Sequence, residues 1–184
     1  MRRIMAIAAV ALAACSSTAT TTTTSSTIPP PVPEELLVEE VVDELGFSIS
    51  RPVDWTPEIE ADLGIASFYS PPVPGDDFTE NFNVARIDIP DELTFEQYVA
   101  TDARTLTQGT AVEIIESGQT DLDGEIAATV RFRTVVDGVN IGFVRAITIH
   151  EGDAYEFTFS ASEEDMDRWL PIVEQFLNTF RFLD

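Results

Sequence analysis

The sequence predicts an α+β domain, in which an antiparallel sheet of about six strands packs against helices. Asp-Gly pairs at 123–124 and 137–138 lie between stretches rich in β-branched residues, which is the strongest short-range signal of a β-hairpin. Two other stretches, around 94–106 and 162–180, repeat apolar residues at helical spacing. Residues 34–184 contain all twelve phenylalanines and both tryptophans, enough to fill the core of one domain.

The turn at Asp137-Gly138 sets the register of the strands on its two sides. Asp-Gly suits a two-residue type I′ turn, because both central positions of that turn need a positive φ. Such a turn pairs Val136 with Val139 and, further along the strands, Phe132 with Phe143. Because side chains alternate between the faces of a sheet, the two phenylalanines are expected on the same face.

The next turn is expected to be longer. Tyr155, Phe157 and Phe159 are the apolar set of the following strand. A loop of three residues, Glu151 to Asp153, places these rings on the face that carries Ile147, whereas a slip of one residue turns them to the other face. The sequence therefore favours a single aromatic face, covered by a helix.

The expected strands are, in chain order, 47–51, 65–70, 82–89, 111–118, 126–136, 139–150 and 154–160. Residues 34–45 fit either a short helix or a first strand, and both remain open.

Two helices are expected from their starting signals. Thr94, followed three residues later by Gln97, matches the capping box that opens a helix. Ser162 and the three acidic residues after it open the second helix, since negative charge favours the amino end of the helix dipole. Pro171 lies inside the second apolar stripe, so a kink or a restart is expected there. Residues 179–182 are predicted to form a short extended tail.

Residues 1–14 are predicted to be a lipoprotein signal peptide. Two arginines precede an apolar stretch of about ten residues, too short to cross ~30 Å of hydrocarbon. Leu12-Ala13-Ala14-Cys15 resembles the bacterial lipobox, which implies attachment of diacylglycerol to Cys15, cleavage before it, and acylation of the new amino group, with palmitate among the acyl chains. Two or three acyl chains suffice for stable anchoring. The sequence therefore predicts a lipid-anchored protein on the extracytoplasmic face of the cell membrane.

Cys15 is the single cysteine, so an intrachain disulfide is excluded. An intermolecular disulfide or a free thiol are the alternatives to the lipid anchor. Residues 15–33 are rich in threonine and proline and are expected to form a disordered linker, with O-glycosylation left open. Residues 34–184 are expected to form one domain.

The charge of the domain excludes some partners. Residues 34–184 contain eight arginines, no lysine and all 33 acidic residues, a formal net charge of −25. Nucleic acid is not expected as a partner, because binding phosphates requires a basic surface. The acidic surface is expected to be solvated, and it can attract a cationic partner or divalent ions.

Several short matches resemble the PsbP-like superfamily, which includes Mog-type Ran-binding proteins and many bacterial lipoproteins. They are spread over most of residues 43–182 and comprise Gly46-Phe47, Pro52, Trp55, Asn81 to Val84, Leu122, Gly124 and the end from Pro171 to Phe182. The resemblance implies an α/β/α sandwich, with an antiparallel sheet between helical layers, and a binding or assembly role. No catalytic motif defines the superfamily, so the resemblance implies no active residue.

Neither a catalytic residue nor a metal site is predicted. His150 is the single histidine, it is expected on the face opposite Phe157, and zinc sites need several nitrogen or sulfur ligands. Residues 119–130 lack the first aspartate and the last glutamate of a calcium-binding EF-hand loop. At most, weak binding of a divalent ion is expected in an exposed acidic loop, which contains Asp76, Asp77 and Glu80. We expect no cofactor and no enzymatic activity.

Arg145 is the candidate contact for a ligand or partner. Strand alternation places it opposite Val130 and beside Phe159 on the aromatic face. It is interpreted either as a structural arginine that reaches solvent or pairs with a helix carboxylate, or as a fixed cation that meets an anionic ligand.

Two functions are favoured by the sequence, and an enzyme, which stands third, would require a cleft holding two carboxylates with perturbed pKa values. The first is a non-enzymatic binding or assembly module that contacts a protein of the cell envelope. The alternative is a carrier of a lipid or another apolar ligand, in a cavity between sheet and helices. An enclosed apolar cavity favours the carrier, and a solid core with an exposed apolar patch favours the protein binder.

Overall fold

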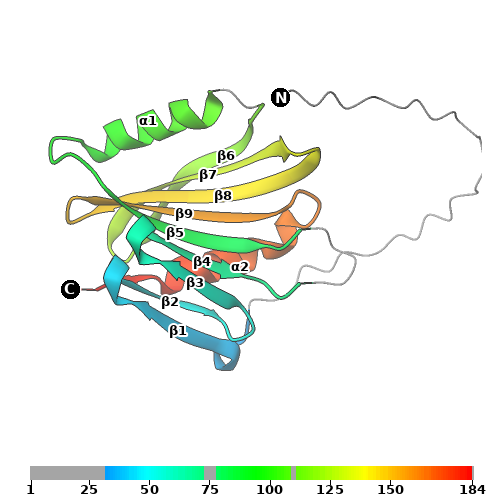
Figure 1. The fold of residues 1–184 in the computed structure, drawn as a ribbon. Coiled ribbons are helices and arrows are strands. Elements are labelled where there is room, and N and C mark those ends of the chain that lie inside the picture. Colours follow the sequence, from blue (N-terminus) through cyan, green and yellow to red (C-terminus); the bar gives the residue numbers. More distant parts are fainter. Residues whose placement is uncertain (1–31, 73–77, 109–110, 184) are drawn as a thin grey trace, which may run out of the picture.

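The computed structural model describes residues 32–72, 78–108 and 111–183, in which two sheets and two α-helices form an α+β fold (Figure 1). The strands are β1 (Leu37–Val42), β2 (Phe47–Pro52), β3 (Thr56–Glu60), β4 (Ile65–Tyr69), β5 (Asn81–Asp88), β6 (Glu113–Leu122), β7 (Glu125–Val136), β8 (Val139–His150), β9 (Asp153–Ser162) and β10 (Arg181–Phe182). The helices are α1 (Phe95–Thr107) and α2 (Met166–Thr179). Within the described ranges, no helix has the length and hydropathy needed to cross a membrane.

All strand pairs are antiparallel, as expected. The larger sheet has seven strands in the order β3-β4-β5-β9-β8-β7-β6, and the smaller sheet has three in the order β1-β2-β10. The question left open at 34–45 is settled in favour of a strand, since β1 lies there between two short 3-10 helices. Strand β3 was not expected, because Pro57 and its acidic neighbours resemble a loop in sequence.

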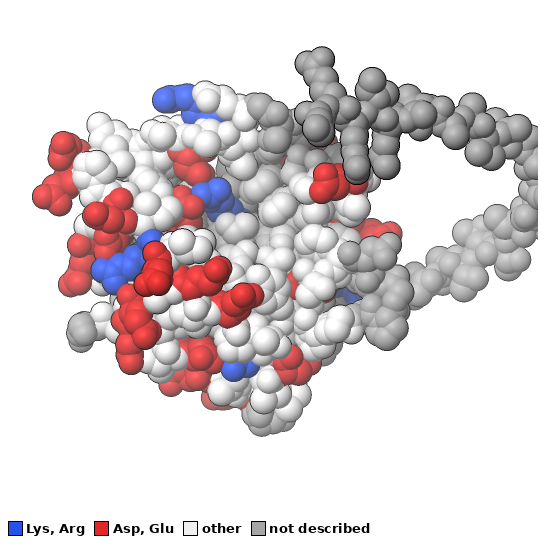
Figure 2. Space-filling view, viewed as in Figure 1, with Lys and Arg blue, Asp and Glu red and all other residues white. Residues whose placement is uncertain are grey.

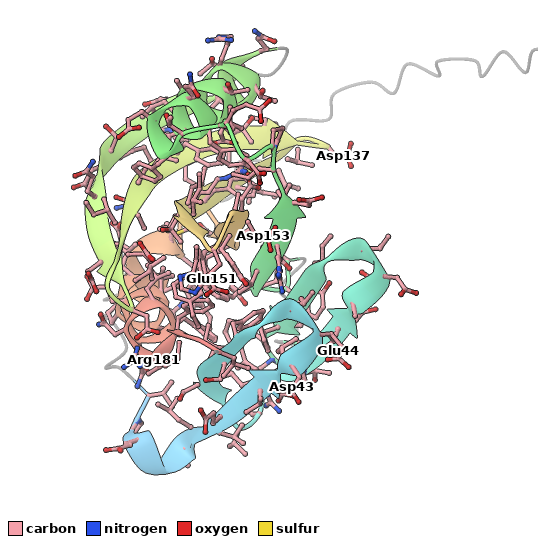
Figure 3. All side chains as sticks on the ribbon, turned by 90° about the vertical axis from the view of Figure 1, so that its left-hand side faces the viewer. Asp43, Glu44, Asp137, Glu151, Asp153 and Arg181 are labelled. Carbon is pink, nitrogen blue, oxygen red and sulfur yellow. The ribbon has the colours of Figure 1, made fainter. Side chains whose placement is uncertain are left out.

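The two Asp-Gly hairpins are confirmed. Asp123 and Gly124 have φ values of 51° and 90°, and Asp137 and Gly138 have 51° and 84°, as type I′ turns require. Val136 pairs with Val139 and Phe132 with Phe143, whose rings stack with centroids 4.9 Å apart. Figure 3 shows Asp137 at the tip of its hairpin.

The expected three-residue loop after β8 is wrong. His150 pairs directly with Asp153, so the turn contains only Glu151 and Gly152, at φ values of 50° and 91°. Tyr155, Phe157 and Phe159 consequently lie on the face opposite Ile147, because the shorter loop shifts the register by one residue. The expectation failed because it assumed one buried face, whereas helices cover both faces of the sheet.

The helix α2 packs on the face that carries Phe157, and the core there is filled by aromatic rings. Phe176 of α2 stacks on Phe82 with ring centroids 4.4 Å apart, and Phe157 meets Phe180 edge-on at 4.7 Å. We call this region the α2 core. Its fully buried large side chains are Phe47, Phe68, Phe82, Phe157, Phe159, Phe176, Phe180, Ile49, Leu122, Met166, Val42 and Val84.

The start of α2 differs from the expectation. Strand β9 continues to Ser162, and the helix begins four residues later at Met166. Met166 is fixed there by close packing, since a Cβ added at Gly142 comes within 3.0–3.2 Å of its side chain. The helix continues through Pro171 to Thr179 as one element, so of the two expected outcomes, a kink or a restart, the restart is wrong. The extended tail is confirmed as β10.

The helix α1 begins as its sequence predicts. Thr94 Oγ1 accepts a hydrogen bond from the Gln97 amide at 3.3 Å, and Gln97 Oε1 accepts one from the Thr94 amide at 3.0 Å. This reciprocal capping box satisfies two amides that have no partner within the helix. The helix lies over the other face of the sheet, on the side of β6, β7 and β8.

Candidate functional site

A groove of about 790 Å³ separates α1 from strands β6, β7 and β8. We call it the α1 groove. Its volume lies within the range of small-molecule and peptide sites, and most of the side chains that line it are apolar. The lining residues are Phe95, Glu96, Val99, Ala100, Asp102, Ala103, Leu106 and Thr107 of α1, Ile114, Ser117, Gly118 and Gln119 of β6, Ala128, Thr129 and Val130 of β7, and Ile147 of β8.

The groove exists because small side chains meet where helix and sheet face each other. Ala100 and Ala103 of α1 lie across from Ser117 and Ala128 of the sheet, and none of these four side chains is long enough to fill the gap. No residue of α1 is fully buried, in contrast to four residues of α2. The helix therefore rests on the sheet without closing the space beneath it.

A polar cluster ties α1 to the sheet beside the groove. The guanidinium of Arg145 on β8 pairs with Asp102 of α1, at 2.9 Å, and with Glu156 of β9. The hydroxyl of Tyr98 on α1 donates a hydrogen bond to Glu156 at 2.8 Å. We call these four residues the Arg145 cluster. It holds the helix through side chains that are largely buried, since the charged members are only 14–18% exposed.

Burial changes the acidity of two members of the cluster. Desolvation raises the pKa of Asp102, an effect that Arg145 opposes and that Glu156 strengthens. Burial, together with the hydrogen bond to Glu156, also raises the pKa of Tyr98, so its hydroxyl stays protonated. The cluster thus contains two carboxyl groups for one guanidinium, and an anionic ligand has no unpaired cation to meet there.

The structure places Arg145 partly as predicted. It lies opposite Val130, but its neighbour on β9 is Thr158, so the expected place beside Phe159 is wrong. The cause is again the two-residue turn after β8. The pairing with a helix carboxylate, which was one of the two interpretations, is present, and it involves Asp102. The Nε of Arg145 is buried and has no hydrogen-bond partner among the described residues.

His150 lies on the same face as Phe157, not on the opposite face as expected. Its ring stacks on Phe182 of β10 with centroids 3.8 Å apart, and Nδ1 is 3.1 Å from the carboxylate of Glu125. These contacts give His150 a structural role, because the stacking of its ring on Phe182 joins the large sheet to the small sheet.

The predicted acidic loop is only partly described. Asp76 and Asp77 lie outside the described residues, as does Cys15. Glu80 is buried and accepts a hydrogen bond from the Ser70 hydroxyl at 2.9 Å, so its expected exposure is wrong. Across the described ranges, no three acidic, histidine or cysteine side chains gather as a metal site would require.

The acidic side chains lie mainly outside the groove. Figure 2 shows them spread over much of one face of the domain, with few arginines between them. Most of the arginines form ion pairs, such as Arg51 with Glu40 and Arg86 with Asp153. Residues 34–184 therefore keep a large negative net charge, because they contain 33 acidic residues and only eight arginines.

A cavity between sheet and helices was expected only for the alternative function, and the residues that line the α1 groove were not predicted from the sequence. The alanines at positions 100, 103 and 128 are its signal, because small residues on facing elements leave space between them. These alanines indicate a groove only when it is already known that α1 packs against β6 and β7.

Several solved structures share this fold. CyanoP, the PsbP protein of the cyanobacterium Synechocystis, has a TM-score of 0.60 at 21% identity and covers 82% of this chain and 95% of its own. LpqN of Mycobacterium tuberculosis, described as involved in cell envelope biogenesis, has a TM-score of 0.59 at 8% identity and covers 75% of this chain and 83% of its own. PA94 of Pseudomonas aeruginosa, a protein of unknown function, has a TM-score of 0.57 at 15% identity and covers 76% and 92%.

The expected PsbP-like fold is thereby confirmed. In sequence, the chain matches no protein-family model and no characterised protein.

Proposed function

We propose that this chain is a lipid-anchored, non-enzymatic binding or assembly module on the extracytoplasmic face of the cell membrane, and that it contacts a partner protein through the α1 groove. The observation that carries the proposal is the open, mainly apolar groove on one face of a sheet whose other face is solidly packed. The lipobox at Cys15 supports the anchor. The similarity of fold to CyanoP and LpqN supports the role.

Exposed apolar residues extend the groove towards one end of the sheet. Ile114, Val136 and Val139 are each at least 44% exposed. They lie on the α1 face, since Ile114 pairs with Phe132 and Val136, four residues beyond Phe132 on β7, pairs with Val139 across the tip of the hairpin. Exposed apolar side chains on one face are typical of a protein contact.

The Arg145 cluster supports a binding role over a catalytic one. Each of its charged groups contacts another member, which supports a role in holding α1 to the sheet. A general acid or base needs a polar group directed at a substrate.

Photocrosslinking in intact membranes tests the proposal. A photoreactive amino acid at Leu106 in the groove is expected to give a specific adduct with one protein, identified by mass spectrometry. The same group at Val53, an exposed residue outside the groove, is the matched control and should not give this adduct. Equal adducts from both positions contradict a contact through the groove.

The anchor is tested separately. Cys15→Ser is expected to abolish labelling by a palmitate analogue and to release the protein from membranes washed at alkaline pH. A mutant that stays with the membrane refutes the anchor but leaves the groove contact open.

The groove volume also supports a second candidate, a carrier of an apolar ligand. Since Arg145 is already paired with two carboxylates, a carried ligand is expected to have a neutral or cationic head, and a fatty acid is not expected to bind. Native mass spectrometry of the purified protein distinguishes the two candidates. A bound small molecule that is lost in Ala103→Trp, where the indole fills the groove, identifies a carrier.

A further inference from the structure

Strand β6 is the outer edge of the seven-stranded sheet next to the α1 groove. In the described part of the chain, it pairs only with β7, and nine of its ten residues are exposed. Its outer edge therefore presents backbone amides and carbonyls that another strand can bind.

The opposite edge of the sheet is protected against such pairing. Strand β3 has only five residues, and these include Pro57, which lacks an amide, and two glutamates. Strand β6 is twice as long and contains no proline. Its one irregularity is a bulge between Ile114 and Glu116, so the stretch from Glu116 to Leu122 is regular.

The turn at Asp123-Gly124 determines which backbone groups of β6 are free. Leu122 and Glu125 flank this two-residue turn and form the first hydrogen-bonded pair of the hairpin. Hydrogen-bonded and free positions alternate along an antiparallel strand, so Asp121, Gln119 and Ser117 direct their amides and carbonyls away from β7.

The free edge and the groove lie side by side. Ser117 and Gln119, whose backbone groups point outward, also line the α1 groove with their side chains. A strand that pairs with β6 therefore extends the floor of the groove beneath α1. Every second side chain of that strand points to the groove, and the others point to the opposite face.

Charge identifies the kind of strand that fits. The regular part of β6 contains Glu116 and Asp121 and no basic residue, and Glu116 forms no ion pair within the described ranges. The nearest arginines, Arg131 and Arg133 on β7, are paired with carboxylates. A second copy of this chain would bring together two domains that each carry a formal net charge of −25, which opposes self-pairing.

We propose that β6 binds an extended, basic segment of a partner protein by β-strand addition, with apolar side chains of that segment entering the α1 groove and basic side chains on the other face near Glu116. This inference rests on the proposed function, since it specifies the partner contact. Main-chain hydrogen bonds supply affinity in this mode of recognition, and the pockets for alternate side chains supply specificity.

The test uses the full-length protein and a synthetic peptide of four Lys-Val repeats, acetylated and amidated. Saturable binding is expected by fluorescence anisotropy, with slowed hydrogen exchange at the amides of Ser117 and Gln119. The same peptide N-methylated at alternate residues, which cannot pair along one edge, and a Glu-Val peptide of equal length should each bind at least about tenfold more weakly.

Gln119→Pro is the decisive variant. It removes an outward amide but no hydrogen bond to β7, so the melting temperature should change little while binding weakens at least about tenfold. Gln119→Ala, which keeps the amide, is the matched control and should bind like the wild type. If Gln119→Pro lowers the melting temperature markedly, the comparison of the N-methylated and unmodified peptides on the wild-type protein still tests the strand addition.

Three results overturn the inference. Equal binding of the N-methylated and the unmodified peptide means that charge alone attracts the probe. Self-association of the protein that Gln119→Pro abolishes means that the edge pairs with a second copy. A crosslinked adduct from Leu106 that persists in Gln119→Pro leaves the proposed function standing and refutes the strand addition alone.

Discussion

The two faces of the large sheet are built by the same strands and differ in almost every physical respect. On β9, Phe157 enters the α2 core, whereas its neighbours Glu156 and Thr158 face α1. On β8, Ala146 faces the rings of the α2 core, whereas Arg145 points to the opposite face and pairs with Glu156 there. One face is dry and closely packed, and the other has a groove and buried charges. Alternation along a strand thus lets one sheet combine a stable core with a hollow surface.

The two helices follow the same division. Four side chains of α2 are buried, and they include Phe176, whereas α1 is held mainly by polar contacts through Tyr98 and Asp102. Apolar burial contributes most of the free energy of folding, so α2 is expected to belong to the stable unit and α1 to open at lower cost.

The largest expected difference between the faces comes from truncating one ring of the core. Phe176→Ala should lower the free energy of unfolding by about 3–5 kcal/mol, because it leaves a cavity among rings that cannot collapse. Val99→Ala in the groove, a smaller truncation on α1, should cost less than ~1 kcal/mol. Urea unfolding measures both. Similar losses would show that α1 packs as firmly as α2.

Phe132→Ala is expected to give an intermediate loss. Phe132 is buried and stacks on Phe143, but it lies on the α1 face. We expect a loss of about 2–3 kcal/mol, below the ~3–5 kcal/mol typical of a buried phenylalanine, since water can enter from the groove and relieve the cavity. Phe157→Ala in the same assay serves as the reference for the α2 core. A larger loss of unfolding free energy for Phe132→Ala than for Phe157→Ala would show that the α1 face is not the less stable of the two.

Asp102→Asn tests the buried charges by their dependence on pH. Folding raises the pKa of Asp102, so the folded wild type loses stability as the pH rises from the unfolded pKa of about 4 through the folded value. The variant has no such loss, and Arg145 keeps Glu156 as its partner. It should therefore melt above the wild type at neutral pH, with a difference that shrinks towards about pH 4. Glu156→Gln, the control, removes the negative charge and replaces with a donor one of the two oxygens that accept hydrogen bonds from Tyr98 and Arg145, so it should melt below the wild type.

The smallest expected effect on stability is that of Ala103→Leu. The added side chain points into open space in the groove, so the free energy of unfolding should stay within about 0.5 kcal/mol of the wild type. Crosslinking of a partner from Leu106 should nevertheless fall. A marked loss of stability would mean that the space between α1 and the sheet cannot hold the larger side chain.

Local signals predicted most of the fold, and long-range packing decided the rest. The turns at Asp123-Gly124 and Asp137-Gly138 were predictable because aspartate and glycine tolerate a positive φ. Glu151 adopts the same conformation without such a propensity, so the turn after β8 was placed wrongly, and the rings of β9 with it. The protein shows two aromatic faces where the sequence suggested one.

The candidate site was less accessible to sequence analysis. Arg145 was paired with a helix carboxylate in one of its two interpretations, and that pair is present, but its second partner, Glu156, depends on the register that the sequence analysis placed wrongly. The groove is a space between side chains, and small residues are too common to signal it alone. Strand β6 was expected, yet its exposed edge follows only from the order of the strands.

The last residues of the chain complete its first strands. Phe180 stacks on Phe47, and Arg181 and Phe182 of β10 pair with Ser48 and Phe47 of β2. Contacts between opposite ends of a chain form late, since the whole intervening length must first be available. A ribosome or a translocation channel that still holds the carboxyl end therefore keeps the α2 core incomplete.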